Sequence, residues 1–387
     1  MAFALGCHRN DCVLFERIRF DRSALSEGTV AESFGADANR AAIFNSASFY
    51  SRDFCRADNY GGDQVSLARN VTAIFRLMLL LEETRMSIRP VKRLMKSKPT
   101  LEGAGVHLRR AFGFGKTSDF DPFLLLDDFR NDIPEDYLAG FPWHPHRGIE
   151  TITYVLAGEV AHGDSMGNSG SIGAGDVQWM TAGSGIIHQE MPKGDSAGRM
   201  HGFQLWANLP AALKMTAPRY QEVKAADIPV VTEDDGTQAR IICGRFWGTK
   251  GPVDGIAADP MYLDVSVPPG KRKALPITTA RHAFAYVFAG SGKFCNASGP
   301  LMVPTESVKW LDTTPPAEAD DRSLVLFDSG DEVVVQAGDD GIRFLLVSGE
   351  PLKEPVAWYG PIVMNTQEQL QKAFEELREG TFLNPPT

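Results

Sequence analysis

The sequence predicts an all-β protein built from two tandem β-barrels and closed by a C-terminal helix. From about residue 88 onward, short runs of β-branched and aromatic residues recur, and Gly, Pro, Asn or Asp interrupts them about every eight to twelve residues, as in sandwiches and barrels. Part of this pattern occurs twice along the chain. Residues 365–380, in contrast, have the apolar periodicity of an amphipathic helix.

The predicted strands follow one another along the chain, each rich in residues that favour the pleated surface of a sheet. They cover 149–160, 176–181, 200–209, 261–267, 282–290, 323–327, 331–338 and 341–349. The closing helix begins with a capping box formed by Thr366 and Gln369, and Gly380 ends it. Its apolar stripe consists of Leu370, Phe374 and Leu377.

An internal repeat indicates the duplication. The run TYVLAG at 153–158 matches AYVFAG at 285–290, an offset of 132 residues. Farther along, GDVQWMTAG at 175–183 matches GDEVVVQAG at 330–338, an offset of 155 residues. Because the two matches occur in the same order, we predict one barrel over 86–220 and a second over 221–387.

Residues 1–85 differ from the rest of the chain. They contain no lysine, although the whole chain has fourteen, and they hold ten arginines and three of the five cysteines. We interpret them as an N-terminal extension of uncertain order, or as a start assigned upstream of a functional start at Met86. The apolar run at 73–83 is too short to span a membrane and contains Arg76, so an amphipathic helix is the better interpretation.

Charge and cysteine content narrow the class of protein. The formal net charge of −10 and the pI near 5.4 argue against nucleic acid or an anionic membrane as the main partner. The cysteines show no CxxC spacing, so neither a disulfide framework nor a zinc knuckle is predicted. We expect a cytoplasmic protein, also nuclear if the source is a eukaryote, that contacts neither nucleic acid nor a membrane directly.

Two spaced pairs of polar residues carry the predicted chemistry. His144 and His146 lie two residues apart on a β-patterned segment, so their side chains share one face, and the same holds for His188 and Glu190. If the two strands are neighbours, three imidazoles and one carboxylate converge. Nitrogen and oxygen donors without thiolate suit Fe, Ni, Cu, Mn or Zn, and open positions beside such ligands are typical of non-haem Fe(II) sites.

Other side chains leave alternatives open. Glu150 is a rival carboxylate, but on a regular strand it lies roughly 13 Å beyond His146, so we favour Glu190 as the ligand and interpret Glu150 as a wall or outer group. Aromatic residues near the pairs suit either a pocket above the metal or core packing: Trp143, Trp179 and Phe203. Four other histidines have no partner at metal-binding spacing and are interpreted as ordinary polar residues: His107, His162, His201 and His282.

The repeat provides an internal comparison for the metal site. The offset of 132 carries His144 and His146 onto Pro276 and Thr278, and the offset of 155 carries the second pair onto Arg343 and Leu345. All four proposed ligands are absent from the second copy. The sequence therefore predicts one metal site, in the first barrel.

Two motifs resemble the pirin family of the cupin superfamily: FPWHPHRGIETITYVLAGEVAHGDSMGNSG at 141–170 and GDVQWMTAGSGIIHQEMP at 175–192. The resemblance extends from about Ser87 to the closing helix. It implies a bicupin, in which each barrel is a double-stranded β-helix and only the first binds a metal. The family's ligands fall on His144, His146, His188 and Glu190, with one divalent ion, usually iron, and with Ni, Cu, Mn, Co or Zn as alternatives.

The resemblance implies two classes of function. One is a quercetin 2,3-dioxygenase-like activity, in which O2 opens the heterocyclic ring of a flavonol, carbon monoxide is released, and Glu190 takes the proton of the 3-hydroxyl group. The other is an iron-dependent, redox-sensitive regulator that binds a transcription factor or a metabolic enzyme. We place the enzyme, with a small aromatic substrate and O2, first. An unrelated natural substrate of the same metal centre remains a third alternative.

Overall fold

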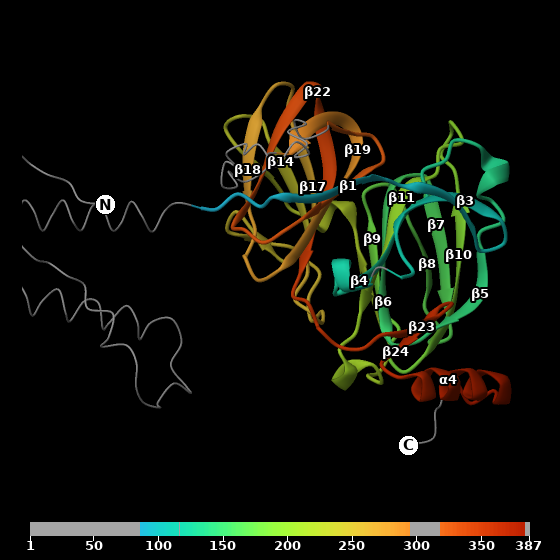
Figure 1. Cartoon of the computed structure of the whole chain (residues 1–387). Helices are drawn as coiled ribbons and strands as arrows, with labels where there is room; N and C mark the ends of the chain where they lie inside the picture. Colours follow the sequence, from blue (N-terminus) through green and yellow to red (C-terminus); the bar gives the residue numbers. More distant parts are fainter. Residues whose placement is uncertain (1–85, 116, 295–317, 384–387) are drawn as a thin grey trace, which may run out of the picture. The chain divides into compact units, whose positions relative to one another are not determined.

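A computed structural model describes residues 86–115, 117–294 and 318–383. The predictions for residues 1–85, including the helix at 73–83, lie outside these ranges. The described chain forms two β-barrels and a C-terminal helix, which confirms the predicted fold class (Figure 1). No helix within these ranges has the length and apolar character needed to cross a bilayer.

The first barrel consists of two antiparallel sheets whose inner faces enclose polar as well as apolar side chains. The larger sheet has the order β12-β9-β6-β11-β4-β3-β2, and its strands are Arg219–Val223, Val177–Thr181, Ile149–Ala157, His201–Asn208, Phe123–Asp128, Val106–Phe112 and Lys98–Glu102. The smaller sheet has the order β5-β10-β7-β8, with strands Phe141–His146, Ile186–Lys193, Glu159–Asp164 and Ser169–Ile172.

The second barrel is one bent sheet whose main path is β1-β21-β19-β22-β17-β14-β13, while β18 pairs with β22 and β20 with β19. In that order the strands are Val91–Lys96, Ser323–Phe327, His282–Phe294, Glu332–Gly349, Met261–Val267, Gln238–Cys243, Val230–Thr232, Arg272–Pro276 and Ala319–Asp320. Its interior is apolar, with Leu263, Leu275, Val333 and Phe344 all fully buried.

Short elements complete the described chain. Two small hairpins pair β15 with β16 and β23 with β24, at Arg245–Phe246, Thr249–Lys250, Ala357–Tyr359 and Ile362–Met364. A four-residue helix, α3, spans Thr117–Phe120, and 3-10 turns lie at Pro134–Asp136, Ala211–Leu213 and Ala225–Asp227.

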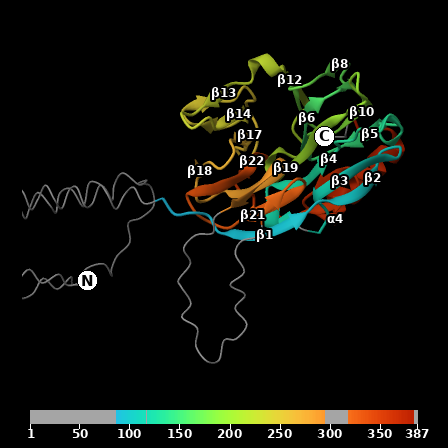
Figure 2. The ribbon, with the colours of Figure 1, turned by 90° about the horizontal axis from the view of Figure 1, so that it is seen from above.

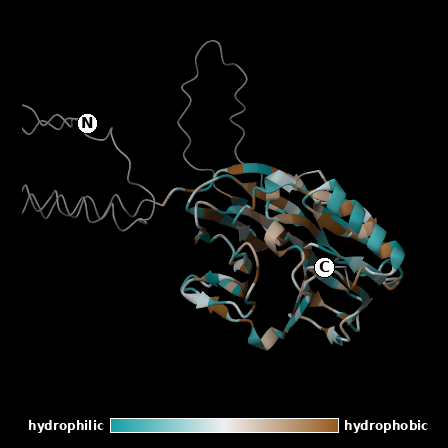
Figure 3. Ribbon diagram, turned by 90° about the horizontal axis from the view of Figure 1, so that it is seen from below, coloured by the Kyte–Doolittle hydropathy of each residue, from teal (hydrophilic) through white to brown (hydrophobic). Residues whose placement is uncertain are grey.

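The closing helix α4, Gln367–Glu379, has the predicted caps. Thr366 and Gln369 form the capping box, and Gly380 adopts a left-handed conformation with φ of 76°. Leu370 and Ala373 are buried on one face of the helix. Much of the rest of the helix is hydrophilic, as the hydropathy colouring shows (Figure 3).

Both ends of the described chain cross from one barrel to the other. The N-terminal strand β1 pairs with β21 at the edge of the second barrel (Figure 2). The segment from β23 to α4, which follows the second barrel in sequence, packs beneath the first one (Figure 1). The domain limits 86–220 and 221–387 stay predictions, but neither barrel is completed by a continuous piece of chain.

An apolar core fills the space between the barrels, with Ile152 and Trp179 from the first and Phe284 and Val347 from the second. Two tyrosines at the repeat offset of 132 residues cross it in opposite directions. Tyr154 donates to Asp264 at 2.8 Å, and Arg343 pairs with the same carboxylate.

Tyr286 donates to Asp128 at 2.8 Å, and Arg130 pairs with that carboxylate. The first half of the repeat is therefore visible as a pair of equivalent interface contacts.

The second half of the repeat aligns strands that are not equivalent. In the first barrel β10 lies between β5 and β7, and in the second barrel the start of β22 lies between β18 and the end of β19. Residues 332–337 therefore correspond to β10, not to β9 as the match at 175–183 implies. Gly-Asp before a strand is turn chemistry that occurs at more than one corner, so the offset of 155 residues was wrong.

Candidate metal centre

The strands β5 and β10 bring the two predicted pairs together. The strands are antiparallel, with Ile186 opposite His146 and His188 opposite His144. The register then shifts, because β5 has one extra residue before Glu190 meets Phe141. Pro142 and Pro145 lack the N–H groups that a continuous ladder requires, which suits an edge strand with a bulge. On β10, the alternating burial of Ile186, His188 and Glu190 confirms that they share one face.

Three histidines form a compact cluster at this point. The ligand atoms offered by His144, His146 and His188 all lie within 4.8 Å of one another. The Nε2 atoms of His144 and His146 are 3.1 Å apart, and the ring of His188 lies 4.4 Å and 5.0 Å from theirs, centroid to centroid. His146 and His188 are buried, whereas His144 is half-buried.

Backbone carbonyls orient two of the rings. Nδ1 of His144 lies 2.8 Å from the carbonyl oxygen of Pro142, and Nδ1 of His146 lies 3.2 Å from that of Pro361. Since a carbonyl only accepts, Nδ1 carries the proton in each neutral ring, and the Nε2 lone pairs of both rings point at the same space. Two lone pairs 3.1 Å apart repel unless a cation or a proton lies between them.

The surroundings of His146 and His188 disfavour protonation of these two rings. Burial, followed by the neighbouring His144, lowers the pKa of His146 well below its usual value. Burial, followed by the other histidines, does the same to the pKa of His188. Within the described residues, neither ring nitrogen of His188 has a hydrogen-bond partner. Buried polar atoms are normally satisfied, so neutral imidazoles with unpaired nitrogens fit a divalent metal ion.

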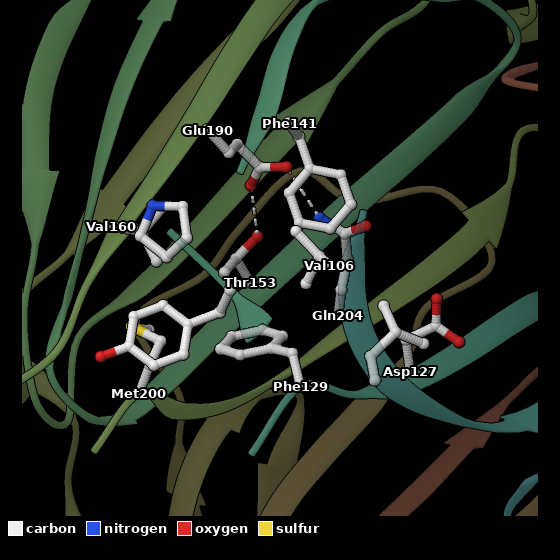
Figure 4. A pocket seen from close by; sticks show the side chains of 12 residues that line it. Val106, Asp127, Phe129, Phe141, Thr153, Val160, Glu190, Met200 and Gln204 are labelled. Atoms are coloured by element: carbon white, nitrogen blue, oxygen red, sulfur yellow. Dashed lines mark hydrogen bonds between the residues drawn. The ribbon is translucent and has the colours of Figure 1, made fainter. Parts of the chain in front are cut away.

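Glu190 follows His188 on the same buried face of β10. Thr153 donates to its Oε1 at 3.0 Å and Gln204 donates to its Oε2 at 3.0 Å (Figure 4). Its carboxylate does not belong to the group of atoms within 4.8 Å that the histidines form. The structure thus places Glu190 on the same face of β10 as His188, held by two donors. Its assignment as the fourth ligand remains a prediction.

A pocket of about 380 Å³ opens onto the histidines. This volume lies within the range of ordinary small-molecule sites, about 300–1,000 Å³. The walls include His144, His146 and the planar side chains of Phe114, Phe141 and Trp206.

Part of the wall of this pocket is charged, with Glu102, Arg110 and Asp127 among its residues. Arg110 forms a two-pronged pair with Asp127, at 2.8 Å and 2.7 Å, and contacts Glu102 at 2.8 Å. Burial raises the pKa of Asp127 to about 6 against the opposing effect of Arg110. The pocket therefore combines two of the proposed metal ligands with planar aromatic side chains and a group of charged residues.

A second, smaller cavity lies on the inner side of Glu190 (Figure 4). Its volume is about 30 Å³, enough for roughly two water molecules but not for an aromatic ligand. Apolar side chains such as Val106, Val160 and Met200 form most of its wall. Of these two cavities, the larger one therefore has room for an organic ligand beside His144 and His146.

The rival carboxylate Glu150 and the three aromatic residues considered for the pocket do not line the larger cavity. Glu150 is opposite Thr181 and Ala207 in the sheet and accepts a bond of 2.7 Å from Thr181. Its side chain shares the face of β6 that carries Ile152, which belongs to the core between the barrels. Trp179 and Phe203 also belong to that core, and Trp143 is 55% exposed. None of the four lines the larger pocket.

The sequence analysis missed two groups around the site, His162 and the backbone carbonyl of Pro361. His162 lies 5.5 Å from the ring of His188, and its nitrogens contact Asp164 at 3.1 Å and Gln178 at 3.2 Å. The spacing of His162 and Asp164 repeats the two-residue pattern of the other pairs, and this pattern was the available clue. The Pro361 carbonyl had none, because a backbone group from a distant segment leaves no mark in the sequence.

Comparisons with known proteins agree with this architecture. The family description Pirin matches residues 105–207, and Pirin C-terminal cupin domain matches residues 262–383. A pirin-like protein of Caulobacter vibrioides is 45% identical over 298 residues, which are 77% of this chain and 100% of the relative. Human pirin is 37% identical over 284 residues, 73% of this chain and 90% of the relative.

A solved structure extends the comparison to an enzyme. The quercetin 2,3-dioxygenase from Acinetobacter baumannii superposes with a TM-score of 0.66 at 29% sequence identity, covering 76% of this chain and 99% of that one. With both halves of the chain matched in order and the relatives covered over most of their length, the chain belongs to the pirin family.

Proposed function

We propose that this protein is a metal-dependent dioxygenase that opens the heterocyclic ring of flavonols such as quercetin, with Fe(II) as its metal. One observation carries the proposal: the cluster of three histidines faces a pocket of about 380 Å³ with aromatic walls. These histidines would hold a metal ion beside a pocket whose aromatic walls suit a planar ligand. The quercetin 2,3-dioxygenase from Acinetobacter baumannii, which shares the fold, supports the choice of substrate.

The proposed roles divide between holding the metal and handling a proton. His144 and His146 would bind through Nε2, His188 through a ring nitrogen, and Glu190 through its carboxylate. When bound, the ion supplies Lewis acidity that lowers the pKa of a coordinated hydroxyl group, together with open positions for O2. Phe141 and Trp206 hold the plane of the substrate in the pocket. Glu190, kept in place by Thr153 and Gln204, accepts the proton of the 3-hydroxyl group at a carboxylate oxygen.

Turnover of quercetin by the Fe(II)-loaded protein tests this proposal. Under air, we expect loss of the flavonol absorbance together with release of carbon monoxide. His144→Ala removes one ligand and should lower both metal content and turnover to background. His107→Ala is the matched control, because His107 is an exposed histidine on β3 that contacts Asp136. Less than about a tenth of an iron per wild-type chain, or equal turnover by wild type and His144→Ala, contradicts the proposal.

A second candidate function is a redox-sensitive regulator. Trp143 directly precedes the metal ligand His144 and is 55% exposed, which is unusual for so large an apolar side chain beside a buried site. A change in the oxidation state of the metal would alter the charge next to this surface. A regulator would bind a protein partner differently in the Fe(II) and Fe(III) forms, and Trp143→Ala would abolish the difference. Full turnover of quercetin with no partner that depends on redox state favours the enzyme.

A further inference from the structure

The C-terminal segment Ala357–Leu383 contacts the metal strand of the other barrel. The carbonyl oxygen of Pro361 lies 3.2 Å from Nδ1 of His146. Directly after it, Ile362 forms a parallel bridge with Arg147, and the N–H of Val363 donates to the carbonyl of Arg147 at 3.1 Å. The segment thus runs alongside the end of β5, next to a proposed ligand.

Arg147 ties the rest of the segment to the same point. Its guanidinium is 2% exposed, pairs with Glu376 of α4 at 2.6 Å and donates to the carbonyl of Phe382 at 2.8 Å. It also stacks on the ring of Phe382, with Cζ 4.2 Å from the centroid. Its Nε donates to Ser184 at 2.6 Å, in the turn before β10. One side chain therefore links both metal strands to α4 and to the segment's end.

A second buried cation fixes the other side of the contact. Lys214 donates to the carbonyls of Gly148 and Val363, at 2.9 Å and 3.1 Å. The backbones of these two residues approach so closely that a Cβ on Gly148 would lie 1.9 Å from the Val363 oxygen. The gap between β24 and the end of β5 is therefore too narrow for any side chain at residue 148.

The same segment forms part of the pocket. Gly360 and Pro361 lie in its wall, and Trp358 stacks on the wall residue Phe114 with ring centroids 4.0 Å apart. The segment therefore orients the ring of His146 and also forms part of the wall of the pocket in front of it.

We propose that Ala357–Leu383 is a positioning element of the metal centre, in which Pro361 holds His146 in the metal-binding tautomer and the Arg147–Glu376 pair holds the segment in place. The inference rests on the proposed metal centre. Groups that orient metal-bound histidines typically contribute about 10-fold to 100-fold to metal affinity. By linkage, metal binding must stabilise the segment as much as the segment strengthens metal binding.

Hydrogen exchange of the full chain tests the linkage. We expect Ni(II), an air-stable probe, to slow exchange of amides in 357–383 more than in β14 or β17, which belong to the second barrel. Wild-type protein that binds neither Ni(II) nor Fe(II) would overturn the metal centre itself. Wild-type protein that binds Ni(II) with unchanged exchange in 357–383 would overturn this inference alone.

A matched pair of variants on α4 tests the affinity. Glu376→Gln leaves Arg147 buried without its charged partner, and we expect the dissociation constant for Ni(II) to rise about tenfold. Glu379→Gln changes an exposed residue of the same helix and should bind Ni(II) as the wild type does. An unchanged dissociation constant in Glu376→Gln, with faster exchange in 357–383, would show that the segment is only structural. If Glu376→Gln does not fold, hydrogen exchange of the wild type decides.

Discussion

Glu190 accepts hydrogen bonds from Thr153 and Gln204, so its two oxygens are fixed while further lone pairs remain. Glu190→Gln keeps the size of the side chain but removes the basic oxygen. Since general-base catalysis contributes about 10²-fold to 10⁴-fold, we expect kcat for quercetin to fall at least about 100-fold. Metal content of the purified variant separates the two proposed roles. Retained iron with lost turnover indicates a base, whereas lost iron indicates a ligand.

Glu150 is buried on the face of β6 that carries Ile152, opposite the face from which Thr153 contacts Glu190. Burial there raises the pKa of Glu150 to about 7. Between its ordinary pKa and about 7 the folded protein binds a proton that the unfolded chain releases, so this residue makes stability fall as pH rises through that window. The full effect is on the order of 3 kcal/mol. Glu150→Gln removes it.

Urea unfolding of the metal-free protein at pH 5 and pH 8 measures this effect. The variant should gain stability relative to wild type on going from pH 5 to pH 8. Glu350→Gln changes an exposed carboxylate and should run parallel to wild type. A difference between wild type and Glu150→Gln that is the same at both pH values would contradict the assignment.

At the scale of elements, periodicity predicted the strands that have regular alternation or strong β propensity, and the caps predicted α4. From the sequence we predicted two strands, at 331–338 and 341–349, but the structure has the single strand β22, Glu332–Gly349. The reason is a close crossing of two backbones. A Cβ on Gly290 of β19 would lie 2.1 Å from the oxygen of Gly341, so paired glycines let both strands bend without ending.

The bounds of β5 were not among the predicted strands, since two prolines and an irregular register interrupt it. Its histidines were found from their two-residue spacing, which an extended segment places on one face. The outer groups of the site were missed for a related reason. Pro361 acts through its carbonyl and lies 215 residues from His146, and no local pattern records such a contact.

At the scale of the whole molecule, the repeat predicted two barrels and one metal site, although half of its alignment was wrong. The inward-facing residues of the strands that correspond to β5 and β10 include Leu275, Val333 and Val335, all in the apolar core of the second barrel. The absence of ligands there holds for the described residues. This conclusion depends on which strands are hydrogen-bonded neighbours in each barrel, and not on the offset of 155 residues.

The equivalent tyrosines Tyr154 and Tyr286 show what remains of the duplication, because each donates across the interface to a carboxylate already paired with an arginine. A hydrogen bond to a charged group contributes about 1.5–3 kcal/mol, so Tyr154→Phe and Tyr286→Phe should each lower the free energy of unfolding by roughly the lower value. The two tyrosines donate to different carboxylates, and the double variant should show about the sum.

Scanning calorimetry adds a second measurement to this comparison. The apolar core between the barrels is intact in both variants, so the barrels should still unfold in one transition. Two separate transitions in the double variant would mean that these tyrosines, rather than the apolar contact, couple the barrels.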